Sequence, residues 1–168
     1  PGDTKFTFQV DEVSTTSGEI STSVLTSDDI YVISFAASKY KEKLDPGNFE
    51  ITLSGTNGSI TLVDDSLSAR NQSGSLERDV YNMVEGNVAT STSNVVLNPP
   101  DGIGLFYPQM GIIVLNPQKL SELVGPELQT PPSGGSEYAL KHKDLFNVIN
   151  NATDIKARST EFVPTRQY

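Results

Sequence analysis

The chain has 168 residues but no cysteine, no tryptophan and only one histidine, His142. The absence of cysteine excludes disulfide bonds, thiolate zinc sites, iron–sulfur clusters and cysteine nucleophiles. A single histidine cannot supply the several imidazole ligands of a histidine-built zinc site. No Gly-x-Ser-x-Gly motif accompanies it, as a serine hydrolase would require. The position of His142 between Lys141 and Lys143 instead predicts a solvated residue at the start of a helix.

Basic residues and long apolar runs are also scarce. The 21 acidic residues outnumber the 12 Lys and Arg, which gives a formal net charge of −9. Such a surface repels phosphate backbones and anionic membranes, so no nucleic-acid or membrane partner is expected. No apolar run reaches the roughly 18 residues that cross a bilayer. The start at Pro1-Gly2, with neither an initiator Met nor a signal peptide, indicates a processed product, an expressed segment or an internal piece of a longer protein.

Turn-forming residues are abundant by contrast. The chain has 13 Gly and 10 Pro among many Ser, Thr and Asn, with an apolar fraction of 36%. This composition favours short strands joined by turns. We therefore predict a mainly β (α+β) fold, an antiparallel sheet or sandwich-like domain with one or two short C-terminal helices. One domain is expected over residues 1–168, with its C-terminal end incomplete.

Three patterns organise the N-terminal part. Phe6, Phe8 and Val10 alternate with polar residues, which predicts a strand with one buried face. Residues 14–27 are rich in Ser and Thr and predict a loop or an exposed edge segment. The unbroken apolar and aromatic run at residues 30–36 predicts a strand buried on both faces.

The strongest structural prediction is a hairpin after residue 45. Asp45-Pro46-Gly47 is typical of a tight turn, because Pro presets φ and Gly tolerates positive φ. Strands are predicted at residues 48–54 and 59–63. Between them, Gly55-Thr56-Asn57-Gly58 predicts the hairpin turn, because an Asn-Gly pair is favoured where both central residues need a positive φ. Further extended segments are predicted at residues 80–84, 94–97, 111–115, 154–158 and 160–168.

The pattern then becomes helical. Asn116-Pro117 is typical of an N-cap and a first helical residue, and Gly125-Pro126 ends the helix that they begin. A flexible connector is predicted at residues 129–137. A second helix is predicted at about residues 143–152, because four apolar residues there fall on one helical face. These are Leu145, Val148, Ile149 and Ala152.

Adjacent carboxylates are the main candidates for chemistry, at Asp28-Asp29 and Asp64-Asp65. Paired acids can serve glycoside hydrolysis or bind calcium. Neither pair belongs to an EF-hand pattern, and adjacent side chains point to opposite sides of an extended backbone. We therefore predict turn-forming acids at strand ends. An enzyme would require a cleft in which distant carboxylates such as Asp65 and Asp101 converge. No catalytic, metal or cofactor residue is assigned.

A carbohydrate-recognition module is the alternative to a structural role. Such a module needs exposed aromatic rings, for which Tyr107, Tyr138 and Tyr168 are the candidates. Aromatic residues of strands are more often buried in the core, and tryptophan is absent. A cluster of exposed rings over a groove would favour glycan binding, whereas flat, polar strand edges would favour assembly.

Several segments in this order resemble large virion structural proteins of T4-like contractile-tailed phages that infect marine cyanobacteria. The resemblance covers most of the chain, from about Tyr31 to the end. It depends on ordered co-occurrence rather than on any catalytic motif. The segments are YKEKLDPG at residues 40–47, FEITLS at 49–54, ITLVDDS at 60–66, GLFYPQMGIIVLNP at 104–117 and TEFVPTRQY at 160–168.

The resemblance implies a non-enzymatic component of the phage particle, from the tail or baseplate. In that family the chain is longer and continues beyond the segment that ends here at Tyr168. Expected partners are other virion proteins or copies of the same chain, with a glycan as the alternative ligand. The expected location is the virion, assembled in the host cytoplasm. The resemblance supplies no catalytic residue and no cofactor.

Overall fold

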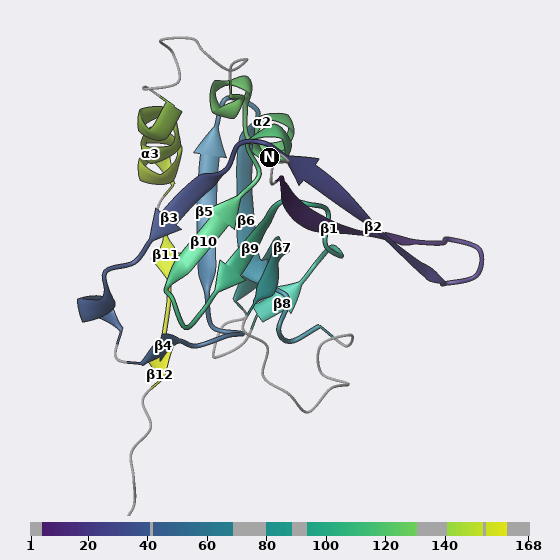
Figure 1. The fold of residues 1–168 in the computed structure, drawn as a ribbon, viewed down its shortest axis with the longest axis horizontal. Helices are drawn as coiled ribbons and strands as arrows, with labels where there is room; N and C mark the ends of the chain where they lie inside the picture. Colours follow the sequence, from purple (N-terminus) through teal and green to yellow (C-terminus); the bar gives the residue numbers. More distant parts are fainter. Residues whose placement is uncertain are drawn as a thin grey trace, which may run out of the picture.

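The computed structural model describes residues 5–40, 42–68, 80–88, 94–130, 141–152 and 154–160. Over these residues the fold is mainly antiparallel β with two helices, which confirms the predicted class (Figure 1). The strands are β1 (Phe6–Val13), β2 (Ile20–Ser27), β3 (Tyr31–Ser34), β4 (Lys43–Leu44), β5 (Glu50–Gly55), β6 (Gly58–Asp64), β7 (Tyr81–Val88), β8 (Asn94–Val96), β9 (Gly104–Tyr107), β10 (Ile112–Leu115), β11 (Ile155–Lys156) and β12 (Ser159–Thr160). The helices are α2 (Pro117–Leu123) and α3 (Lys141–Asn151).

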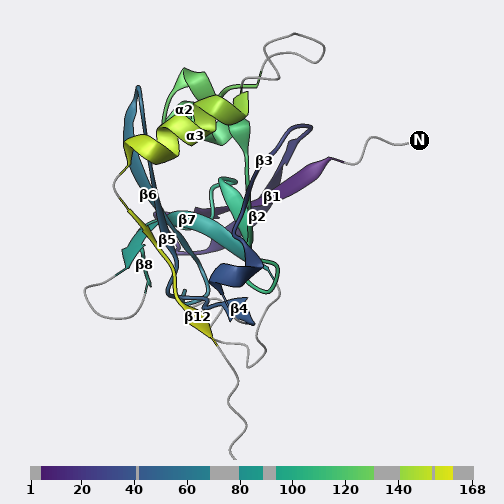
Figure 2. The ribbon, with the colours of Figure 1, turned by 90° about the vertical axis from the view of Figure 1, so that its left-hand side faces the viewer.

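The body of the molecule is one curled sheet. Its strand order is β11-β5-β6-β7-β9-β10-β3, with β8 paired to β7, while β12 pairs separately with β4. Phe49, just before β5, stacks on Phe106 of β9 with 5.0 Å between ring centroids. It also meets Phe35, just after β3, edge to face at 5.7 Å. Because β5 and β3 lie near opposite ends of the strand order, these contacts require the sheet to curl around a common core (Figure 2).

The two helices lie together at one end of this sheet (Figures 1 and 2). Leu120 of α2 and Leu145 and Val148 of α3 join the buried core. Asn116 caps α2 as predicted, since its Oδ1 accepts a hydrogen bond from the Gln118 N–H at 3.1 Å. The second predicted helix is confirmed as α3, which begins two residues earlier than expected.

The predicted hairpin is confirmed as β5–β6, with its turn at the predicted residues, Gly55-Thr56-Asn57-Gly58. The positive φ expected at both central residues is wrong, because these residues are Thr56 and Asn57 and no described residue other than glycine has a positive φ. The turn is instead held from outside. The Thr56 N–H donates to Glu127 Oε1 at 2.8 Å, and the Asn57 N–H donates to the Val124 carbonyl at 2.7 Å. Contacts from the end of α2 and the following turn therefore stabilise a backbone that the Asn-Gly pair alone does not dictate.

One edge prediction is corrected. The segment at residues 30–36 is not buried on both faces, because β3 is the last strand of the sheet and Val32 is 53% exposed. The segment at residues 14–27 was predicted as a loop or an exposed edge segment, and Ile20–Ser27 within it forms the exposed strand β2, which agrees with the second alternative. Of the predicted connector at residues 129–137, residues 131–137 lie outside the described part of the chain, as do residues 161–168.

Candidate functional site

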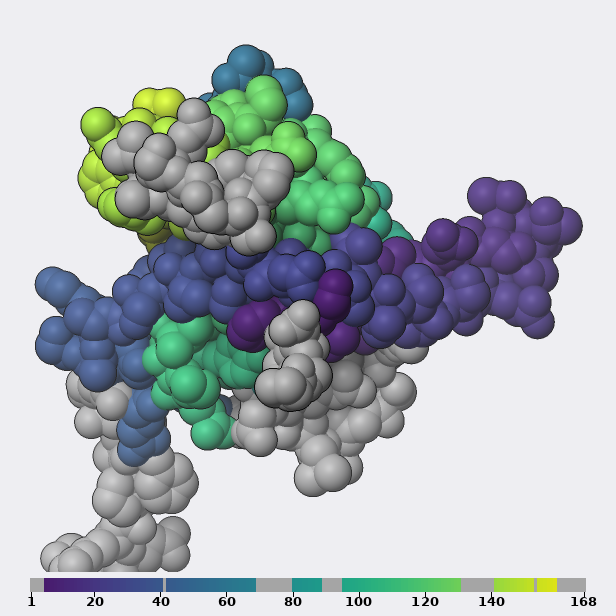
Figure 3. Space-filling model, turned by 45° about the horizontal axis from the view of Figure 1, so that its top comes forward, coloured from purple at the N-terminus to yellow at the C-terminus, as the bar shows by residue number. Residues whose placement is uncertain are grey.

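Strands β1 and β2 form a two-stranded ribbon that projects from the body. They pair antiparallel over their whole length, from Phe6 opposite Ser27 to Val13 opposite Ile20. Figure 1 shows the ribbon extending to the side of the curled sheet, and Figure 3 shows its outer half standing clear as a purple arm. An arm of this kind adds little to the core of a domain, so it is the part of the molecule that most needs a functional explanation.

The base of the ribbon is fixed to the body. Phe8 is fully buried, and Val10 forms a β-bridge with Asp101. The Asp11 N–H donates to the Pro100 carbonyl at 2.7 Å, and the Gly102 N–H donates to the Gln9 carbonyl at 2.9 Å. The inner half of β1 is therefore held by the 98–102 segment on the edge opposite β2.

An ion pair reinforces this anchor. Lys119 of α2 lies 3.1 Å from the Asp101 carboxylate and 3.5 Å from that of Glu122. Burial acts to lower the pKa of Lys119, but the hydrogen bond and charge of Asp101, with those of Glu122, outweigh it and hold the pKa above its usual value. The helix, the 98–102 segment and the ribbon base thus form one connected unit.

One face of the ribbon presents apolar side chains to solvent. Val13, Ile20 and Val24 are 50, 54 and 65% exposed. The pairing register places them on the same face, since Val13 is opposite Ile20 and Val24 is opposite Gln9. Exposed β-branched residues along a strand of a projecting arm are typical of a contact surface.

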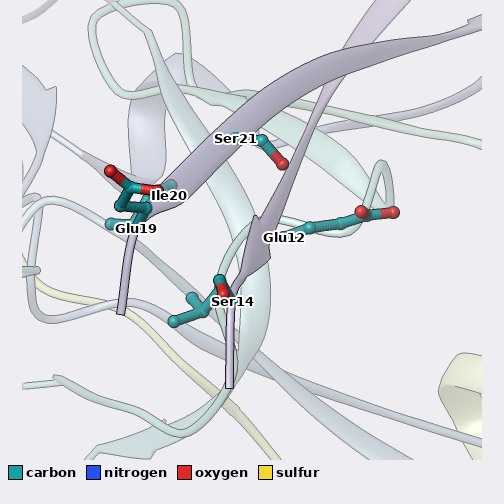
Figure 4. A pocket seen from close by; sticks show the side chains of 6 residues that line it. Glu12, Ser14, Glu19, Ile20 and Ser21 are labelled. Atoms are coloured by element: carbon teal, nitrogen blue, oxygen red, sulfur yellow. The ribbon is translucent and has the colours of Figure 1, made fainter. Parts of the chain in front are cut away.

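A hollow of about 550 Å³ lies at the outer end of the ribbon (Figure 4). Its lining combines two carboxylates, two hydroxyls and two apolar side chains from both strands. They are Glu12, Val13, Ser14, Glu19, Ile20 and Ser21. The lining holds no aromatic ring on which a sugar could stack and no histidine, so the hollow offers polar contacts but no sugar platform.

A second hollow, of about 290 Å³, lies where the ribbon meets the body. Val10, Ile60 and Leu123 give it an apolar lining, and Glu85 and Asp101 are among its carboxylates. Both of these carboxylates already have partners, since Glu85 accepts a hydrogen bond from Asn98 and Asp101 pairs with Lys119. Their present role is to hold the segment that anchors β1.

The Asp64-Asp65 pair is placed at a strand end, as predicted, and both residues are buried. The two Asp64 carboxylate oxygens accept hydrogen bonds from the Gly47 N–H at 2.9 and 3.0 Å. Asp65 accepts hydrogen bonds from the N–H and the side-chain amide of Asn82, both at 2.9 Å. Asp64 therefore secures the Pro-Gly turn, and Asp65 secures the start of β7.

The other predicted carboxylates do not gather into a reactive centre. Asp28 is exposed and pairs with Lys5 at 3.1 Å. Asp65 and Asp101 are engaged by different partners, Asn82 and Lys119, and neither hollow is lined by both of them. Each of these two carboxylates therefore has a structural partner of its own.

The histidine and tyrosine candidates lie at separate positions in the chain. His142 is exposed at the second residue of α3, as predicted. Tyr107 is half-buried in β9, and Tyr138 and Tyr168 lie outside the described residues. Among the described residues no group of three His, Asp or Glu side chains could hold a metal ion. In the same part of the chain no helix is long and apolar enough to cross a membrane.

The pairing of β1 with β2 into a projecting ribbon is the feature that sequence reasoning missed. Its signal was present in Ile20, Thr22, Val24 and Thr26, which are β-branched residues at a period of two. The serines between them resembled a loop. A comparison of the chain with protein-family models, curated proteins and solved structures finds no match.

Proposed function

We propose that this chain is a non-enzymatic structural component of a phage particle, from the tail or baseplate region. The observation that carries the proposal is the projecting β1–β2 ribbon. It is anchored at its base by Asp101 and Lys119, and one face along its length exposes Val13, Ile20 and Val24. A rigid body with a projecting, partly apolar arm is suited to joining neighbouring subunits. Other virion proteins or copies of this chain are the proposed partners.

A carbohydrate-recognition or host-adhesion module remains the alternative function. The polar hollow at the ribbon tip is the observation that favours it, because carboxylates and hydroxyls can bind sugar hydroxyls. Its lining provides no ring for stacking, and Val24, more exposed than Val13 or Ile20, lies along β2 outside the hollow. The arrangement therefore supports assembly more than glycan binding.

The proposal is tested by locating the chain in purified particles of the phage that encodes it. Antibodies raised against the chain are expected to label one end of the tail, with pre-adsorbed antibody as the control. Quantitative mass spectrometry of the same particles should find the chain at a fixed ratio to known tail proteins. Its accumulation in the lysate with none in washed particles would contradict the proposal.

A further inference from the structure

The hollow of about 290 Å³ where the ribbon meets the body combines apolar surface with negative charge. Ile60 and Ile103, which line it, are 7 and 4% exposed, and Val10 and Leu123 add further apolar surface. The described residues around the hollow include four carboxylates but no Lys, Arg or His. The carboxylates are those of Asp11, Glu12, Glu85 and Asp101.

Two of these carboxylates, Glu12 and Glu85, are placed to meet a ligand. Glu12 lies two residues after Val10 on β1, so the two side chains are on the same face of the ribbon. Both line the hollow, and Glu12 is exposed. Glu85, in β7, is half-buried and accepts a hydrogen bond from the side-chain amide of Asn98. That donor is neutral, so this hydrogen bond leaves the negative charge of Glu85 in place.

The nearby cation Lys119 is already engaged by other acids. Its ammonium lies 3.1 Å from the Asp101 carboxylate and 3.5 Å from that of Glu122. One positive charge is therefore shared between two carboxylates, and it does not also balance Glu12 and Glu85. A second cation, brought by a ligand, would have both of these acids as partners.

We propose that this hollow binds an arginine side chain of a partner protein, with Glu12 and Glu85 holding the guanidinium. The inference rests on the assembly function proposed above and specifies the chemistry of the partner. Arginine has an apolar stem, which suits the lining at Ile60 and Ile103, and a charged head. Its guanidinium presents several N–H donors in one plane, so it matches carboxylates better than the compact ammonium of lysine does.

Net charge indicates a different protein, rather than a second copy, as the source of this arginine. Each chain carries a formal net charge of −9, so two copies repel one another. A basic segment of another protein would be attracted instead. The lining of the hollow comes from β1, β6, β7 and α2, so a segment bound there would contact the ribbon and the body together.

The test is an NMR titration of the chain with its isoleucine methyl groups isotope-labelled. Ile60 and Ile103 line the hollow, whereas Ile155 lies on β11 and serves as an exposed reference. The probe is the capped tripeptide glycyl-arginyl-glycine, and in its control peptide citrulline, of similar shape but without charge, replaces arginine. We expect the arginine peptide to shift the Ile60 and Ile103 resonances with a Kd of roughly 1 mM. The Ile155 resonance should stay in place, and the citrulline peptide should shift none of them.

A pair of matched substitutions tests the role of charge. Glu12→Gln should weaken binding of the arginine peptide about two- to fivefold, as expected for an ion pair near the surface. Glu19→Gln is the control, because it removes one acid from the same ribbon, but Glu19 lines the hollow at the ribbon tip and not this one. It should leave the Kd unchanged. Both glutamates are exposed, so neither substitution should disturb the fold.

Equal shifts with the arginine and citrulline peptides would overturn the proposal, because charge would then play no part. The absence of any shift at Ile60 and Ile103 would overturn it as well. Equal weakening by Glu12→Gln and Glu19→Gln would also overturn it, in favour of attraction by the net charge of the whole chain. The antibody experiment locates the chain in phage particles without using this hollow, so the two proposals can fail separately.

Discussion

At the scale of single residues, Tyr31 shows how one buried polar group links distant segments. Its hydroxyl donates to the Leu128 carbonyl at 2.9 Å, which ties β3 to the turn that follows α2. Burial, followed by the negative charges of Asp144 and Asp29, raises the pKa of Tyr31 to about 12. The neutral, hydrogen-bonding form is therefore favoured in the folded chain.

This raised pKa predicts a specific loss of stability in alkali. Because the folded pKa lies above the ordinary 10.0, the contribution of Tyr31 is complete below pH 10 and is lost as pH rises toward about 12. Tyr31→Phe should lose about 1–3 kcal/mol at neutral pH, since the Leu128 carbonyl loses its buried partner. Denaturant titrations of both proteins across this range measure the effect. An alkaline decline of equal depth in Tyr31→Phe would contradict the assignment.

The acids at strand ends show what a sequence can and cannot predict at this scale. The turn-forming role of Asp64 was predicted from its place after an apolar strand. Its burial and its bond to the Gly47 N–H depend on a residue 17 positions away, which no local pattern specifies. Glu127 is similar, since it holds the N–H of Thr56 across 71 positions. Long-range polar pairings of this kind depend on the tertiary fold, which brings the distant residues together.

At the scale of elements, the ribbon base depends on a close approach at Gly102. Gly102 has φ +69°, and an added Cβ would lie 3.1 Å from a methyl group of Leu25 and 3.3 Å from one of Val10. Gly18, in the turn at the ribbon tip, has nearly the same φ of +70° but open space around it. A comparison of Gly102 with Gly18 therefore separates the effect of backbone strain from the effect of packing at the ribbon base.

We expect Gly102→Ala to lower the free energy of unfolding by more than Gly18→Ala does. Both substitutions force alanine into the left-handed region, at a cost of about 1–2 kcal/mol. Gly102→Ala must also displace Leu25 or Val10, whereas the exposed tip can relax without disturbing the body. Chemical denaturation of the two variants measures the difference. Equal destabilisation would mean that the ribbon base is not tightly packed.

Elements with strong local signals were predicted, and those defined by their neighbours were not. The β5–β6 hairpin and the Asn116 cap of α2 follow from local apolar alternation and capping chemistry. Strand β2 was predicted only as a loop or an exposed edge segment, because its serines carry no apolar signal and its pairing with β1 decides its conformation. Strand β3 resembles a central strand in composition, but its edge position is fixed by the sheet topology.

At the scale of the whole molecule, polar contacts hold the strand at one edge of the curled sheet. This edge strand, β11, is held on β5 by an ion pair of 2.7 Å between Lys156 and the buried Glu50. The other carboxylate oxygen of Glu50 accepts a hydrogen bond from the Val88 N–H. The hydrogen bond and charge of Glu50 hold the pKa of Lys156 above its usual value. This edge of the sheet is therefore closed by polar bonds.

The central claim is that the β1–β2 ribbon joins this chain to a neighbouring subunit, and hydrogen exchange of the ribbon's backbone amides tests this most directly. Exchange is measured by mass spectrometry of peptides that cover residues 6–27, in the isolated chain and in purified phage particles. We expect these amides to be better protected in the particles, while amides of the β5–β6 hairpin exchange equally in both samples. Equal exchange of the ribbon amides in both samples would contradict the account.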